Sequence, residues 1–379
     1  MSAASLTLRI LERVREIPEA TWDALLGEDS SPFLEHRWLD ALEETGCVGG
    51  DTVWIPAHLS LWEGPRLVAV APSYAKGNSE GEFVFDWSWA DFAMRAGVRY
   101  YPKLVVAVPF TPATGDRVLV APGEDRIAVT RRLASAAREW CTRAGASGVH
   151  VLFPREAEAR AWEAAGYARR DGFQFHWHRE GAASFDDYLA RFNSKQRNQI
   201  KREVRGVESS GIVVETLPPE GHTHAVARRM HELYASTIDK HGVWGRLYLN
   251  EAFFETLIDR FRDRLAWVVA RQGQGGEIVA GAFNVVRGKR LYGRYWGTRV
   301  DVPFLHFAVC YYAGVRYCLE KCIDVFEPGA GGEHKRARGF VPTVTHSAHW
   351  IADARLRAAL GPWLERERER VRSIVEDGA

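Results

Sequence analysis

Signals for secondary structure recur in a similar order in both halves of this sequence, and that repetition restricts the fold more than any other feature. In the first half, two apolar runs around a Glu-Gly-Pro turn at residues 63–65 predict a β-hairpin. Residues 125–144 then carry apolar side chains at helical spacing, and residues 149–153 have the pattern of a buried strand. Further strands are predicted at 82–89, 104–108 and 173–177, and a helix at 155–165.

The second half repeats this order with different residues. Two apolar runs flank the glycine-rich turn at residues 273–277 and predict a second hairpin, and the strand at 290–296 precedes a long helix at 305–322. Because strands and helices mix in the same order twice, we expect an α/β fold with an internal structural duplication. The remaining predicted elements are helices at 185–209, 225–240, 251–262 and 354–374, the last broken or kinked at Gly361-Pro362, and strands at 212–217, 325–327 and 343–350.

Length and composition are those of an ordinary globular protein with two domains. The chain has 379 residues, of which 46% are hydrophobic and 26% charged. We place the boundary near residues 181–184, so the expected domains are 1–180 and 181–379. The 14 Trp provide aromatic surface for a large core and also suit a wide cleft that binds a semi-polar substrate.

Charge and cysteine content exclude several classes of function. Lys and Arg total 50 and Asp and Glu total 49, so the net charge of +1 gives no basis for DNA binding and leaves only a local basic patch for RNA. The five Cys lack the companion ligands of a zinc site, so we expect no metal and a reducing cytoplasm. Charges interrupt the apolar runs of the N-terminus and no stretch of about 18 uncharged apolar residues occurs, so neither a signal peptide nor a membrane span is expected.

Several strings give the chain a resemblance to Fem-type enzymes of the GNAT superfamily. In the second half these are Ser194-Lys-Gln-Arg-Asn-Gln-Ile-Lys-Arg-Glu, Gly293-Arg-Tyr-Trp-Gly and Phe326-Glu-Pro-Gly-Ala. Over residues 30–370 the chain resembles a bacterial Fem-like family labelled peptidoglycan biosynthesis/recognition or GNAT family N-acetyltransferase, through strings such as Gly332-Glu-His-Lys-Arg-Ala-Arg-Gly-Phe. The resemblance implies a mixed α/β sheet in two tandem GNAT-like acyltransferase domains, the first on the acceptor side and the second with the donor site and catalytic loop.

The same resemblance implies an amide-forming acyl or aminoacyl transferase without a permanently bound cofactor. The donor would be aminoacyl-tRNA, with tRNA as the carrier partner, and the acceptor an amine-bearing small molecule or peptide. Acyl-CoA or a carrier-protein thioester is the alternative donor, although no Q/R-x-x-G-x-G/A turn for a pyrophosphate lies between a strand and a helix. A non-catalytic module that recognises cell-wall peptide is a second alternative.

The best candidate for catalysis is the glycine-rich segment at residues 327–340. Glu333, His334 and Lys335 offer a base, a proton shuttle and a cation in succession, and Arg336 and Arg338 suit a phosphate or carboxylate. Amide formation needs a deprotonated amine and a stabilised oxyanion, which these groups can provide. A turn with solvated charges is the alternative.

Two further groups in the second half are candidates for substrate binding. Regular alternation on a strand puts Tyr292, Arg294 and Trp296 on one face, and an Arg among aromatics needs an anionic ligand or a core carboxylate such as Glu327. At the start of the 305–322 helix, the helix dipole lowers the pKa of a histidine, so His306 is a candidate base with Tyr311 nearby, or a core histidine. Together these two groups predict a donor site.

Charged residues outside this region suggest an acceptor site and a phosphate site. Glu82 and Asp86 share one face of the predicted strand 82–89 and, with Lys103, line an expected cleft for a cationic amine; a solvated face is the alternative. The basic helix contains cations that could contact tRNA or diphosphate, or simply face solvent. Those cations are Lys195, Arg197, Lys201 and Arg202.

Overall fold

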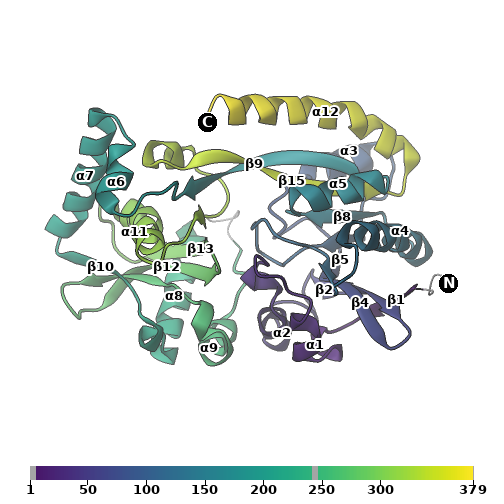
Figure 1. Cartoon of the computed structure of the whole chain (residues 1–379), viewed down its shortest axis with the longest axis horizontal. Helices are drawn as coiled ribbons and strands as arrows, with labels where there is room; N and C mark the ends of the chain where they lie inside the picture. Colours follow the sequence, from purple (N-terminus) through teal and green to yellow (C-terminus); the bar gives the residue numbers. More distant parts are fainter. Residues whose placement is uncertain (1–5, 241–245, 379) are drawn as a thin grey trace. The chain divides into compact units, whose positions relative to one another are not determined.

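The computed structural model describes residues 6–240 and 246–378, which form two compact units. The first unit runs to Phe173 and resumes at Val344–Gly378, and the second comprises Gln174–Thr343. The chain passes from one unit to the other along two long strands, β9 (Ala168–His178) and β15 (Val341–Ile351). Figure 1 shows the helices and strands of each unit in the colours of the sequence.

Two groups of strands build the first unit. One is an antiparallel sheet in the order β1-β3-β4-β7, in which the predicted hairpin is formed by β3 and β4. The other has the order β2-β5-β6-β8-β15, with β6 and β8 parallel. The bounds are β1 Leu6–Leu11, β2 Ile55–Pro56, β3 His58–Glu63, β4 Arg66–Ala71, β5 Ser73–Lys76, β6 Lys103–Val106, β7 Leu119–Val120 and β8 Gly148–Leu152.

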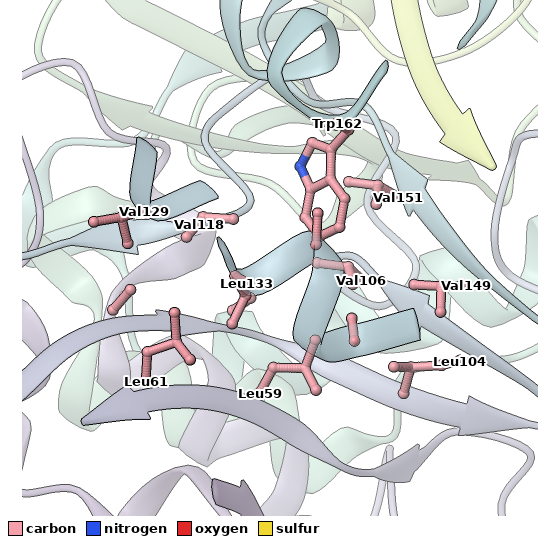
Figure 2. Packing of buried hydrophobic residues seen from close by; sticks show 14 of the residues in the cluster. Leu59, Leu61, Leu104, Val106, Val118, Val129, Leu133, Val149, Val151 and Trp162 are labelled. Atoms are coloured by element: carbon pink, nitrogen blue, oxygen red, sulfur yellow. The ribbon is translucent and has the colours of Figure 1, made fainter. Parts of the chain in front are cut away.

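The core of the first unit includes the apolar face of the long helix α4 (Arg126–Ala144), a helix that the sequence predicts. Asp125 caps its first turn by accepting hydrogen bonds from two backbone N–H groups, and Gly145 ends it in the left-handed region with φ 67°. Figure 2 shows Leu133 of this helix and Trp162 of α5 (Glu156–Ala164) among the buried side chains of the strands. Burial of this surface provides the main stabilisation of the unit.

Residues 82–89 do not form the predicted strand. Helix α3 (Trp87–Arg95) begins inside this segment, and its residues Trp89 and Ala93, one helical turn apart, are both buried. The residue before the helix, Asp86, is held by hydrogen bonds from Tyr100 and Lys103, which fix the turn into the helix. The apolar alternation of this segment is therefore misleading, since tertiary contacts decide its structure.

The C-terminal segment belongs to the first unit and not to the second, which differs from the expected division at 180/181. Strand β15 pairs with β8, and helix α12 (Ala354–Glu376) packs Leu356, Leu360 and Leu364 in one cluster with Trp89. Helix α12 continues through Pro362, so the break predicted near this position does not occur. The apolar face of α12 thus determines the unit to which it belongs.

The second unit is built on the strand order β10-β11-β12-β13-β14-β9. Neighbouring strands are antiparallel except β13 and β14, which are parallel. Helix α8 packs so closely on β12 and β13 that a Cβ added at Gly297 would lie 1.8 Å from the backbone oxygen of Leu233. The bounds are β10 Ile212–Thr216, β11 Val268–Gln272, β12 Ile278–Arg287, β13 Arg290–Thr298, β14 Val325–Glu327, α6 Phe185–Ala190, α7 Ser194–Ser209, α8 His224–Lys240 and α9 Glu251–Arg260.

Short helices complete the described part of the chain. In the first unit these are α1 (Glu19–Asp23) and α2 (His36–Glu44). Within residues 6–240 and 246–378, no helix has the length and apolar character needed to cross a membrane.

Candidate functional site

Strand β13 carries a β-bulge at Arg294. Phe283 of β12 faces Tyr295, whereas the next residue, Asn284, faces Gly293, so β13 has one residue more than its partner here. A bulge bends its strand, interrupts the ladder and turns the neighbouring side chains to new directions. The sequence gives no clear signal for this irregularity, because the string Leu-Tyr-Gly-Arg-Tyr-Trp-Gly is compatible with a regular strand.

The bulge makes one prediction about side-chain direction wrong. Regular alternation places Tyr292, Arg294 and Trp296 on one face, but the extra residue shifts the alternation by one position. Tyr292 therefore shares a face with Tyr295 and is buried, with 1% of its surface exposed. Trp296 lies on the other face, where its ring centroid is 4.6 Å from that of His306.

The pairing of strands β13 and β14 stops just before the bulge, and a cavity lies beside this point. The two strands pair up to Tyr292 and Glu327, where β14 ends, while β13 runs on to Thr298. The cavity has a volume of about 80 Å³, enough for several waters or for the reacting end of a substrate. Its lining comes from β12, β13, the helix after β13 and the turn after β14: Ala282, Asn284, Gly293, Arg294, Tyr295, Trp296, His306, Cys310, Tyr311 and Pro328.

Gly293 permits this arrangement because it has no side chain. A Cβ added there would lie 3.2 Å from Cα of Pro328 and 3.3 Å from Oδ1 of Asn284. Both neighbours line the cavity, so any larger residue would push against its walls. The predicted donor residues Arg294, Trp296, His306 and Tyr311 are thus brought to one place.

The predicted helix at 305–322 contains a π-helical turn. It consists of α10 (Leu305–Phe307), the π turn η6 (Ala308–Tyr312) and α11 (Ala313–Glu320). Such turns shift the register of a helix and are frequent at functional sites. Here the turn carries Cys310 and Tyr311, which line the cavity together with His306.

Two histidines and a tyrosine form a connected group beside the cavity. The hydroxyl of Tyr311 lies 2.9 Å from Nε2 of His334, and the rings of His306 and His334 are 5.8 Å apart. Burial, aided by the charges of His334 and Lys335, lowers the pKa of His306 to about 4. Burial, with Arg338 and Lys335, also lowers the pKa of His334, while burial raises that of Tyr311. At neutral pH both imidazoles can therefore accept a proton, and the phenol can donate one.

The predicted catalytic loop forms a short 3-10 helix, Glu333–Arg338, whose charged residues separate into two groups. Glu333, His334 and Arg336 are exposed. Lys335 is buried, and its Nζ donates a hydrogen bond of 2.7 Å to the carbonyl oxygen of Gly329. Burial lowers the pKa of Lys335 to about 8. This lysine therefore holds the glycine-rich turn in place.

Arg338 is also held inside the protein. Its guanidinium donates to Oε1 of Glu203 at 2.8 Å and to the carbonyl oxygen of His334 at 2.7 Å, and it lies over the ring of Phe307. The Tyr312 hydroxyl donates a second hydrogen bond to Glu203. Arg338 is 4% exposed, so the geometry favours a role in positioning His334 over direct contact with a ligand.

Glu203 is the residue that reasoning from the sequence missed. It lies within the basic helix α7, where Lys201 and Arg202 precede it and Arg205 follows two residues later. A signal was present: Ile200, Glu203 and Val207 have helical spacing, and all three are buried. An acid on the apolar face of a helix needs a buried partner, and here that partner is Arg338.

The other predicted residues of α7 lie near or at the surface. Asn193 caps the helix by accepting a hydrogen bond from the backbone of Gln196. Arg197 donates to the carbonyl oxygen of Phe192. The exposed cations of the predicted phosphate site are Lys195, Lys201 and Arg202.

Glu82, Asp86 and Lys103 come together in the first unit as a buried ion cluster. Nζ of Lys103 donates to Oε2 of Glu82 at 2.9 Å and to Oδ2 of Asp86 at 2.6 Å. Burial acts to lower the pKa of Lys103, but the two carboxylates outweigh it and raise that pKa. All three residues are less than 5% exposed, so they do not form the open acidic face expected for an acceptor cleft.

Solved structures show which class of protein has this fold. The crystal structure of FemX aligns with a TM-score of 0.52 and 12% identity, over 91% of this chain and 98% of FemX. The C-terminal domain (DUF2156) of a putative lysylphosphatidylglycerol synthetase from Agrobacterium fabrum aligns with a TM-score of 0.52 and 12% identity, over 92% of this chain and 95% of that one. These similarities confirm the expected class, a mixed α/β protein of tandem GNAT-like domains.

The family follows from the sequence of nearly the whole chain. The model of the FemAB-like family, described as peptidoglycan biosynthesis/recognition, matches residues 13–378. The protein belongs to this family, which confirms the resemblance to Fem-like proteins. A search of curated proteins gives no match.

Proposed function

We propose that this protein transfers an acyl or aminoacyl group to an amine and so forms an amide. The observation that carries the proposal is the cavity beside the point where the pairing of β13 and β14 stops, with His306, Tyr311 and Arg294 in its wall. A carbonyl carbon in this cavity would lie beside both a neutral imidazole and a phenol that keeps its proton. Membership of the FemAB-like family supports the proposal.

The reaction needs three things from the protein. The amine must lose a proton as it attacks the carbonyl, and the neutral imidazole of His334 is the group we assign to accept it. The negative charge on the carbonyl oxygen must be stabilised, which is the role assigned to Arg294 at the bulge. The leaving oxygen or sulfur must gain a proton, which the hydroxyl of Tyr311 can donate before His334 restores it.

Among donors, we favour aminoacyl-tRNA. The exposed cations of α7 suit a polyphosphate carrier outside the cavity, while the cavity itself has room only for the reacting end of the donor. The fold shared with FemX is consistent with an aminoacyl donor. Acyl-CoA and carrier-protein thioesters remain the alternative donors.

Mass spectrometry of candidate amines tests the donor. Purified protein is incubated with an amine-bearing peptide and, in separate arms, with charged tRNA, acyl-CoA or an acylated carrier protein. The proposal predicts a mass increase of one aminoacyl residue in the tRNA arm, abolished by RNase. Product in only one of the other arms would identify the carrier in that arm as the donor instead of tRNA. The absence of product in every arm would favour the second candidate function, which is described next.

That second candidate is recognition of cell-wall peptide without catalysis. It is favoured by one observation, that Lys335 and Arg338 of the loop are engaged in internal contacts. It predicts binding of a muropeptide in calorimetry with no covalent product.

A further inference from the structure

The first unit contains a second and larger cavity that the proposed transfer reaction does not use. Its volume is about 630 Å³, within the range of small-molecule sites. One wall is helix α3, from which Trp87, Ala90 and Met94 project at a spacing that places them along one side. The other walls are residues 78–80 and the segment 97–101, so the whole cavity lies within one unit.

The wall provided by α3 is apolar and open to solvent. Trp87 is 48% exposed and Met94 is 70% exposed. Eight large hydrophobic side chains are exposed among the described residues. Four of them, including Trp87 and Met94, lie between positions 85 and 94. Clustered exposed apolar side chains are typical of interaction surfaces and ligand grooves. The cavity therefore suits a ligand with an apolar chain or ring.

The floor of the cavity presents a hydroxyl oxygen that can accept a hydrogen bond. The Ser79 hydroxyl accepts a hydrogen bond from Lys103 at 2.9 Å. The Tyr101 hydroxyl lies 2.7 Å from that of Ser79, and either of the two can be the donor of this bond. In both cases the Tyr101 oxygen keeps a lone pair, and Tyr101 lines the cavity.

Charges at the cavity point to the same kind of ligand. Two acidic residues, Glu80 and Asp91, belong to its lining. The cation in the lining, Arg99, donates a hydrogen bond to the carbonyl oxygen of Gly145. A ligand group that donates hydrogen bonds and carries positive charge therefore complements both the floor and the rim.

We propose that this cavity binds a primary ammonium compound with an apolar chain or ring. The ammonium group donates to the Tyr101 oxygen beside Asp91, and the apolar part lies on Trp87, Ala90 and Met94. The site is formed by the first unit alone, so the proposal does not depend on the transfer reaction assigned to the second.

Calorimetry with three probes of equal chain length tests the proposal on the full chain. The probes are n-octylammonium, n-octanol and octanoate, each below its micelle-forming concentration. The expected result is saturable binding of octylammonium at least tenfold tighter than of the other two. Equal affinities, or no binding of octylammonium, would overturn the proposal; binding only to zwitterionic lipid vesicles in a fourth arm would instead assign the apolar surface to a membrane.

Three variants locate the site. Tyr101→Phe removes the acceptor and should weaken octylammonium binding roughly tenfold, and Asp91→Lys should weaken it further while leaving octanol unaffected. Ala90→Trp fills the cavity and should abolish binding; if this variant does not fold, the first two still decide. Ile127→Ala, at another exposed apolar residue of the same unit, is the control and should bind as the wild type does. Unchanged affinity in Tyr101→Phe and Asp91→Lys would overturn the assignment.

Discussion

Replacing Glu203 with Gln tests whether the catalytic loop is held by a buried charge on the basic helix. Glu203 is 1% exposed, and it accepts hydrogen bonds from Arg338, Tyr312 and Gln199. The amide introduced by Glu203→Gln keeps the shape and one acceptor oxygen but removes the negative charge. Arg338, itself 4% exposed, then becomes a buried cation without its anion.

The expected loss of stability follows from that uncompensated charge. Removing one partner of a buried ion pair costs about 3–5 kcal/mol, and we expect about 3 kcal/mol because hydrogen bonding is partly kept. For a unit of this size, such a loss lowers the melting temperature by roughly 6–12 °C. Because Arg338 also donates to the carbonyl oxygen of His334, the transfer rate should fall as well.

Thermal unfolding followed by circular dichroism measures the effect, with Glu215→Gln as the matched control. Glu215 pairs with Arg271 at 2.7 Å in the same unit, but its side chain is 41% exposed, so its loss should cost less than about 1 kcal/mol. Equal melting temperatures for the two variants would refute the idea that Glu203 holds the loop.

Three further predictions follow from the same structure. Gly293→Ala places a methyl group against Pro328 and Asn284, so transfer activity should fall sharply and stability by about 1–3 kcal/mol; normal activity would mean that the cavity is not the reaction site. Lys103→Met leaves two buried carboxylates without the cation they share and should cost about 3–5 kcal/mol in a urea titration, against less than about 0.5 kcal/mol for Lys195→Met at the surface. The pKa of His306 is about 4 in the folded protein and near 6.5 when unfolded, so the unfolded chain binds more protons between these pH values. The free energy of unfolding should therefore fall as the pH drops from 6.5 to 4. His306→Leu should lose less stability over this range than the wild type, and an equal loss would contradict the assignment.

Local sequence patterns were sufficient to predict several helices and hairpins. The helix predicted at 125–144 is α4, because a capping Asp125 and a terminal Gly145 define its two ends. The hairpins around residues 63–65 and 273–277 are also confirmed, since turn residues and apolar runs specify them together.

The predictions that failed concern segments whose structure depends on contacts with residues distant in the sequence. Apolar and polar residues alternate over 82–89 as in a strand. The buried hydrogen bond between Lys103 and Asp86 and the packing of Trp89 instead favour a helix that begins in this segment. The bulge at Arg294 depends on how β12 and β13 pair, which no local pattern encodes. The expected acceptor residues are close together, as predicted, but they neutralise one another inside the first unit.

Single-turnover rates of amide formation test the account most directly. His334→Ala and Arg294→Ala are compared with the wild type and with His224→Ala, which removes a partly exposed histidine of the same unit. The account predicts a loss of at least about a hundredfold in the first two variants, with unchanged melting curves, and a normal rate in the third. Wild-type rates in both His334→Ala and Arg294→Ala would show that the cavity beside β13 and β14 is not where the amide forms.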